Sequence, residues 1–136
     1  KRGNAMHNPF AVILLAGLAA WLFGAAWYML LGKPWQMAHG VASGSGPRRM
    51  PVVPLAVCLV GEVVMAAVVY QTLDHLGVRG ALFGAVAGLT LGVGFLLTST
   101  VINHQFLQKP PIATVIDGLH WTLVVAIQGA VVGALL

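Results

Sequence analysis

The chain has 136 residues, of which 59% are hydrophobic and 7% are charged, whereas roughly a quarter of the residues in an ordinary soluble domain are charged. This composition excludes a soluble globular fold and indicates an integral membrane protein. The net charge of +4 does not indicate nucleic-acid binding, because the basic residues lie between or outside the apolar blocks, where they anchor helix ends and contact lipid headgroups.

Four apolar blocks, each long enough to span a bilayer at about 20 residues, predict an all-α fold: a bundle of four transmembrane helices in one domain. In chain order the helices are expected at residues 9–31, 52–73, 81–102 and 112–136. Residues 1–5 precede Met6 and are expected to be an upstream extension or a vector-derived remnant, so that the domain covers residues 6–136. Strands are not expected, because the alternation of a membrane barrel strand is missing.

The connections between the blocks differ in length. Residues 32–50 are rich in Gly, Ser and Pro and predict a loop, while Lys109, Pro110 and Pro111 predict a tight connection before the last helix. Four spans place both termini on one face of the membrane and the loops after the first and third helices on the other. Lys33, Arg48, Arg49 and Lys109 lie at the loop face, which favours a cytoplasmic location for those loops.

Small residues at four-residue spacing predict where the helices approach one another closely, because backbone contact in lipid depends on side chains that do not obstruct it. The third block contains such a series and the fourth contains a pair. These glycines are Gly80, Gly84, Gly88, Gly92, Gly129 and Gly133. Such seams also suit a second copy of the chain, so a homodimer is expected.

Polar residues within the spans are functional candidates, because ionisable groups are costly inside a bilayer. Glu62 lies near the middle of the second block, and none of its helical neighbours, including Cys58, is expected to pair with a carboxylate. It is therefore protonated, or paired with another helix, or exposed to a wet cavity. Asp117 and His120 are three residues apart, face the same side and can hydrogen-bond, and Gln128 extends their stripe.

Helix direction brings several of these residues into one layer at the loop face. Asn103 is eleven residues after Gly92, which rotates it by about 20° from the glycine seam and predicts that it points into the bundle. We expect one polar pocket that opens toward the loop face and binds a ligand or a proton. Its candidate residues are Asp117, His120, Asn103, Glu62, His104, Trp27, Tyr28, Lys33 and Trp35.

More specific chemistry is less well supported. His104, Asp117, His120 and His39 are a set from which metal ligands could come, but no His-x-x-x-His or Cys pair makes the geometry specific. The hydroxyl groups near His120, those of residues 98–100, are more simply explained as bonded to their own helix. The sequence identifies no catalytic residue and no cofactor.

The residues that form this layer carry a family resemblance. Trp27-Tyr28 followed by Gly32-Lys33 and Trp35, Asn103 at the end of the third helix, and Ile116-Asp117-Gly118 with His120 resemble the domain of unknown function family 1761, which consists of small four-helix bacterial membrane proteins. The resemblance covers essentially the whole chain from Met6, and it implies the four-helix fold and a bacterial inner-membrane location. It implies no activity. The chain has Leu119-His120 where members often have Tyr-His, and it lacks their proline after the Trp-Tyr pair.

Three hypotheses about function follow. In the first, the protein binds or translocates a small solute, ion or proton through the pocket near Asp117 and His120. In the second, it is a structural or partner-binding membrane subunit in which the same groups hold helices together. An intramembrane enzyme with a lipid-like substrate is the third. The expected partners are the lipid bilayer, a second copy of the chain and a small-molecule or ion ligand.

Overall fold

The computed structural model of the protein describes residues 8–41 and 51–136. Lys1, Arg2, Arg48 and Arg49, to which the sequence assigned topology roles or an origin outside the domain, lie outside the described residues. Within them, four helical stretches are long and apolar enough to cross a membrane, and the third consists of three consecutive segments. The elements are α1 (Pro9–His39), α2 (Val52–His75), α3 (Ala81–Leu91), the π-helical η1 (Gly92–Leu97), α4 (Thr98–Phe106) and α5 (Pro111–Leu135).

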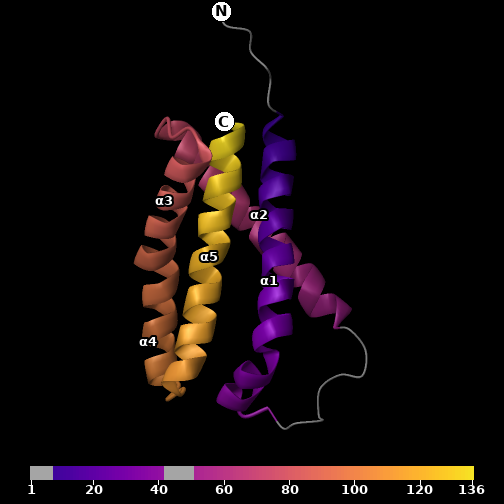
Figure 1. Cartoon of the computed structure of the whole chain (residues 1–136), viewed down its shortest axis with the longest axis vertical. Helices are drawn as coiled ribbons and strands as arrows, with labels where there is room; N and C mark the ends of the chain where they lie inside the picture. Colours follow the sequence, from indigo (N-terminus) through magenta and orange to yellow (C-terminus); the bar gives the residue numbers. More distant parts are fainter. Residues whose placement is uncertain (1–7, 42–50) are drawn as a thin grey trace, which may run out of the picture.

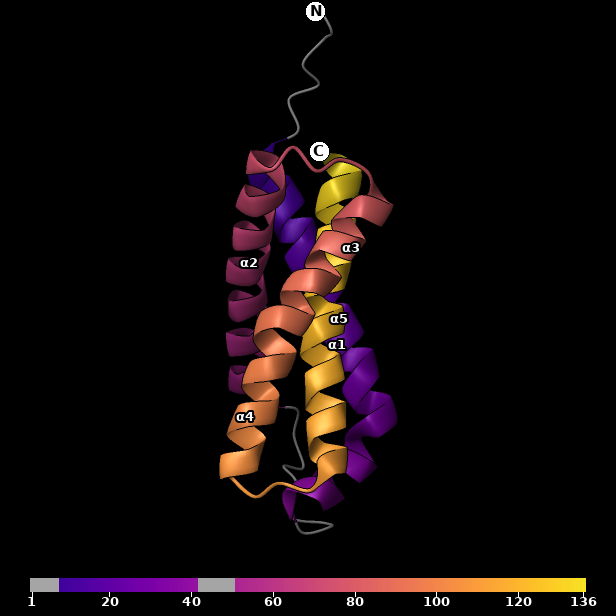
Figure 2. The same ribbon diagram turned by 90° about the vertical axis from the view of Figure 1, so that its left-hand side faces the viewer.

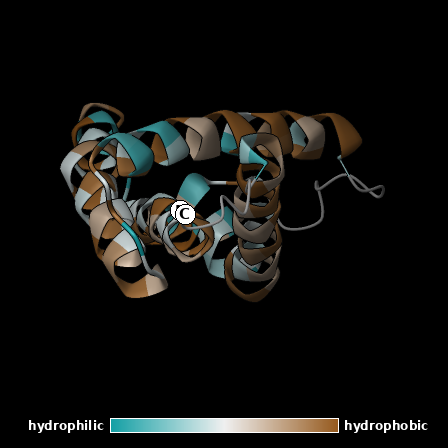
Figure 3. Cartoon of the chain, turned by 90° about the horizontal axis from the view of Figure 1, so that it is seen from above, coloured by the Kyte–Doolittle hydropathy of each residue, from teal (hydrophilic) through white to brown (hydrophobic). Residues whose placement is uncertain are grey.

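The last helix, α5, is the centre of the bundle. It packs against α1, α2 and all three segments of the third span, and it lies between α1 and α3 in Figure 1 and among the other helices when the bundle is viewed from above in Figure 3. Half of its most apolar stretch is buried, against 28% or less for the other three. The large apolar side chains of those helices instead face outward, as expected for a surface in contact with lipid.

The first helix is longer than predicted. The sequence predicted a loop from residue 32, but α1 continues to His39 and contains Pro34. A proline inside a helix removes one amide donor and crowds the carbonyl group one turn earlier, yet α1 continues past Pro34 and ends where Gly40 adopts the left-handed conformation at φ 71°. The Gly40 amide donates to the Met37 carbonyl oxygen at 3.2 Å, and the Val41 amide donates to the Gln36 carbonyl oxygen at 2.9 Å. The extra two turns place Trp35 and His39 beside the polar layer.

The third span contains a π-helical turn that changes which residues face inward. Figure 2 shows the span running from α3 into α4 through this turn. A π-helical turn accommodates one extra residue, so every later residue is rotated by about 100° relative to a regular helix. The prediction that Asn103 points into the bundle is therefore wrong: Asn103 is exposed, donates to the Ser99 hydroxyl at 3.5 Å, and leaves the inward position to His104.

The predicted glycine seam lies between α3 and α5. A Cβ atom built on Gly84 would lie 2.9 Å from the carbonyl carbon of Gly129, and one built on Gly92 would lie 2.9 Å from the Cα of Thr122. The Gly80 amide donates to the Gly133 carbonyl oxygen at 2.6 Å. The two helices therefore touch through their backbones, which only glycine permits at these positions.

Candidate functional site

Asp117 is the centre of a polar cluster at the end of the bundle where α1 and α4 finish and α5 begins. The hydroxyl of Tyr28 and the indole N–H of Trp35, both on α1, donate to its Oδ1 at 3.1 and 2.8 Å. These two donors fix the orientation of the carboxylate, since charge-assisted hydrogen bonds are strong and directional. The other oxygen, Oδ2, then faces away from both donors.

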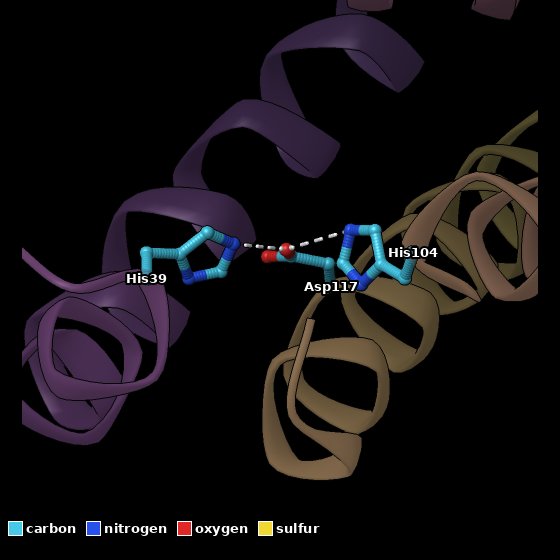
Figure 4. Close-up of side chains that lie close together, drawn as sticks. All are labelled: His39, His104 and Asp117. Carbon is cyan, nitrogen blue, oxygen red and sulfur yellow. Dashed lines mark ion pairs between the residues drawn. The ribbon is translucent and has the colours of Figure 1, made fainter. Parts of the chain in front are cut away.

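Two histidines face this second oxygen, as Figure 4 shows. The Nε2 atom of His39 on α1 is 3.1 Å from Asp117 Oδ2, and the Nε2 atom of His104 on α4 is 3.6 Å from it. Each ring is also held on its far side: His39 Nδ1 lies 2.9 Å from the Trp35 carbonyl oxygen and His104 Nδ1 lies 3.1 Å from the Thr114 hydroxyl. The cluster thus joins three helices.

His120 lies one turn further into the bundle and does not join this cluster. It is 1% exposed, and neither ring nitrogen has a hydrogen-bond partner among the described residues. The predicted hydrogen bond with Asp117 is absent there because the Asp117 carboxylate is directed to Tyr28 and Trp35. His120 instead packs among aromatic rings, with centroid distances of 4.8 Å to both Tyr28 and Trp121.

Glu62 on α2 is equally buried, at 1% exposure. The expectation that no neighbour on its own helix pairs with it is wrong, because the Cys58 thiol donates to Glu62 Oε1 at 3.3 Å, although thiols are weak donors. The second oxygen, Oε2, has no partner in the part of the chain that the structure describes. Gln128 on α5 donates its Nε2 to the backbone carbonyl of Glu62 at 2.9 Å, which ties α2 to α5.

Gly24 on α1 brings His120 and Glu62 to a common space. A Cβ atom built there would lie 3.0 Å from His120 Nε2 and 3.7 Å from Glu62 Oε1, so the absence of a side chain leaves room between the two groups. A cavity of about 390 Å³ adjoins this space. It lies between α1, α2 and α5, and its lining includes Trp21, Gly24, Tyr28, Leu55, Cys58 and His120.

The predicted site residues therefore divide into two groups. Tyr28, Trp35 and His104 gather with Asp117, while Glu62 and His120 meet at Gly24; Trp27 is within 6.4 Å of the His120 ring by centroid. Lys33 and Asn103 are exposed and belong to neither group. Gly24 was not among the predicted site residues, and the sequence gave His39 only as a metal-ligand candidate; the C-terminal glycine signal at Gly40 could have extended α1 to include His39.

Chemically, the deeper group offers two protonatable side chains with free polar atoms beside a largely apolar cavity. Small-molecule sites commonly combine apolar walls with a few convergent polar groups. A carboxyl and an imidazole that face one space can bind a guest that hydrogen-bonds or carries a proton.

The fold and the buried polar groups define a multi-pass membrane protein with a polar site inside its helix bundle. The model of a family of proteins of unknown function, DUF1761, matches residues 11–133, and the chain belongs to this family. The match confirms the resemblance inferred from the polar layer. No curated protein and no solved structure matches the chain.

Proposed function

We propose that the protein binds a small solute, ion or proton in the pocket between α1, α2 and α5, with His120 and Glu62 as the groups that contact it. The observation that carries this proposal is that His120 Nε2 and Glu62 Oε1 both face the space left by the missing side chain of Gly24, next to the cavity of about 390 Å³. Translocation would follow a path from this pocket to the Asp117 cluster, with Tyr28 contacting both.

Unsatisfied polar atoms support the proposal. Five buried atoms of the deeper region lack hydrogen-bond partners among the described residues: Trp27 Nε1, Glu62 Oε2, His120 Nδ1 and Nε2, and Gln128 Oε1. Such atoms cost several kcal/mol each where lipid excludes bulk water, so a guest that supplies hydrogen bonds would be stabilised here. Helix packing alone does not require these residues to leave their polar atoms free.

The test uses Gly24→Ala, which fills the space without removing a polar group, and Gly32→Ala, a matched control on the same helix whose added methyl meets no atom within 4 Å. Purified protein is reconstituted into liposomes that contain a pH-sensitive dye, and a potassium gradient with valinomycin drives proton entry. We expect the wild type and Gly32→Ala to exceed empty liposomes and Gly24→Ala to fall to their level. Native mass spectrometry of the same samples detects a retained solute.

Loss of both the proton flux and the retained solute in Gly24→Ala identifies the guest site, provided that the wild type, Gly24→Ala and Gly32→Ala melt at similar temperatures. Equal flux and equal solute retention in Gly24→Ala and Gly32→Ala would refute the proposal. Glu62→Gln adds a second comparison, because it retains the side-chain shape while removing the ionisable group. Under the proposal it stops proton flux and leaves the melting temperature within a few degrees of the wild type.

A structural or partner-binding subunit is the second candidate, and the Asp117 cluster favours it. Asp117 receives two hydrogen bonds from α1 and lies next to histidines of α1 and α4, which is the arrangement of a clasp between helices. Under this alternative, Asp117→Asn lowers the melting temperature in detergent while flux and solute binding stay unchanged in every variant. A flux difference between Gly24→Ala and Gly32→Ala would argue against it.

For cellular location, we propose the bacterial inner membrane, with the loops after the first and third helices in the cytoplasm. Lys33 and Lys109, both at the loop end, support this orientation. It places the C-terminus outside the cytoplasm. A C-terminal alkaline phosphatase fusion should therefore be active and a C-terminal green fluorescent protein fusion dark; the opposite pattern reverses the topology.

We also propose a homodimer, but through a different interface from the glycine seams that the sequence predicted. The predicted seams are used inside the bundle, where Gly84, Gly129 and Gly133 contact one another's helices, so they are not free for a second copy. Gly61 on α2 is exposed, and a methyl group there would meet no atom within 4 Å, which leaves a position for close approach. Native mass spectrometry of wild type and Gly61→Leu tests this face: loss of a dimer in the variant supports it.

A further inference from the structure

We propose that His39, His104 and Asp117 form a binding site for a divalent first-row transition metal ion of the zinc or iron class. This site is distinct from the pocket of the proposed function. None of its three ligand residues lines the cavity between α1, α2 and α5, and they lie at the helix ends while His120 lies one turn deeper. The metal site can therefore be present or absent whatever the deeper pocket does.

The geometry of the three ligand atoms fits a metal ion. Asp117 Oδ2 is 3.1 Å from His39 Nε2 and 3.6 Å from His104 Nε2, and all three atoms lie within 4.8 Å of one another. Zinc binds histidine nitrogen and carboxylate oxygen at about 2.0–2.2 Å, so two ligands of a tetrahedral ion are roughly 3.3–3.5 Å apart. The two separations from Asp117 Oδ2 bracket that range.

The positions of the protons also favour a cation. The Trp35 carbonyl oxygen can only accept, so His39 Nδ1, which is 2.9 Å away, carries a proton. In the neutral ring, Nε2 then presents a lone pair toward Asp117 Oδ2, which also has only lone pairs to offer. Two acceptors at 3.1 Å repel each other unless a positive charge lies between them. A proton on Nε2 supplies that charge to His39 and Asp117 alone, whereas a metal ion bound by both atoms supplies it to His104 as well.

The surroundings supply the supporting contacts that metal sites use. Bound histidines typically donate their other ring nitrogen to a carbonyl or another oxygen, as His39 does to the Trp35 carbonyl and His104 can do to the Thr114 hydroxyl at 3.1 Å. Tyr28 and Trp35 occupy Asp117 Oδ1 and leave Oδ2 for the ion. Each of the three ligand side chains therefore has a hydrogen-bonding contact on the side that faces away from the ion.

Access and ligand number indicate an open site. The three side chains are 13–15% exposed, so an ion can enter from the loop end of the bundle. Two imidazoles and one carboxylate leave at least one coordination position free. A mixed nitrogen and oxygen set of this kind prefers Zn²⁺, Fe²⁺ or Co²⁺ to Mg²⁺ and Ca²⁺, which take oxygen ligands.

The experiment measures Zn²⁺ and Co²⁺ binding to the full chain, purified in detergent with a tag that contains no histidine. Isothermal titration with Zn²⁺ gives stoichiometry, and the visible absorption of bound Co²⁺ reports nitrogen and oxygen coordination. We expect one ion per chain. We also expect Zn²⁺ affinity at least 100-fold weaker in His39→Ala and in Asp117→Asn, and no binding of Mg²⁺ at the same concentrations.

Matched controls come from the opposite end of the bundle, where Asp74 and His75 are exposed on α2. Asp74→Asn and His75→Ala should bind Zn²⁺ as the wild type does. Trp35→Phe removes a donor to Asp117 Oδ1 but no ligand. It should weaken binding by about 10–100-fold with unchanged stoichiometry, the usual effect of losing a hydrogen bond that orients a metal ligand. A helix clasp without a metal would show no such effect.

Three results would overturn the proposal. They are no Zn²⁺ or Co²⁺ binding by the wild type, equal affinity in wild type and Asp117→Asn, or an equal loss in His75→Ala. If Asp117→Asn fails to fold, His104→Gln serves in its place, because it replaces a ring at 3.6 Å from the carboxylate rather than the hub of the cluster. Loss of proton flux in Gly24→Ala with intact Zn²⁺ binding would separate the two sites.

Discussion

Substituting Gly84 by alanine tests whether backbone contact between α3 and α5 holds the bundle together. The added Cβ would lie 2.9 Å from the carbonyl carbon of Gly129 and 3.0 Å from the Cα of Gly133, and closer still to the Gly129 oxygen. Because all of these are backbone atoms of a helix, no side-chain rotation relieves the contact. The two helices must separate.

The size of the effect follows from these distances. Optimal carbon contacts lie at about 3.5–4.0 Å, so the helices move apart by roughly 0.5–1 Å, and a gap of that size forfeits about a quarter to a half of each affected dispersion contact. Packing and not hydrophobic burial drives helix association in lipid. Overpacking of this kind typically costs about 1–3 kcal/mol, which we expect as the loss of stability.

The control is Gly32→Ala on α1, where the added methyl meets no atom within 4 Å. It isolates the helix-propensity gain of about 1 kcal/mol that alanine brings. Unfolding is followed by circular dichroism in mixed micelles as the fraction of dodecyl sulfate increases. Gly84→Ala should unfold at a lower fraction than Gly32→Ala by an amount that corresponds to about 1–3 kcal/mol; equal stability of the two variants would refute the backbone-contact interpretation.

Three further predictions concern single contacts. Gln128→Leu removes the hydrogen bond to the Glu62 carbonyl and should cost no more than about 1.7 kcal/mol in the same assay, the upper end for such bonds in membranes. Trp21→Phe removes an indole hydrogen bond of 3.1 Å to the backbone of α2 and should lower the free energy of unfolding by about 0.6 kcal/mol. A larger loss of stability would show that Trp21 contributes more than this hydrogen bond. Gly40 has a φ of 71°, so Gly40→Ala should lower the free energy of unfolding by about 1–2 kcal/mol. It should also weaken Zn²⁺ binding, because it frays the helical turn that carries His39. An unchanged Zn²⁺ affinity would show that this turn does not position His39.

Much of the fold could be predicted because lipid leaves few alternatives. Each span needs about 20 apolar residues and closed backbone hydrogen bonds, and the predicted helix starts agree with Pro9, Val52, Ala81 and Pro111 to within one residue. The helix ends were harder to predict. Hydropathy falls where α1 leaves the apolar block, but the backbone continues as a helix until Gly40 ends it.

The candidate site shows where periodicity fails. The stripe of Asp117, His120 and Gln128 was predicted from the 3.6-residue repeat, which holds along the regular helix α5. The repeat does not hold across η1, and no sequence signal revealed the extra residue that turns His104 inward in place of Asn103. Side-chain direction was the second limit: residues three apart on a helix can bond, but Asp117 bonds across to α1 instead.

The most direct test of the deeper pocket is an experimental structure of the protein in lipid nanodiscs at a resolution that shows small bound molecules. We predict density between α1 and α2, within hydrogen-bond distance of His120 Nε2 and a Glu62 carboxyl oxygen. A structure in which His120 and Glu62 bond directly to each other, and in which lipid chains alone fill the adjoining cavity, would rule out a guest in this pocket.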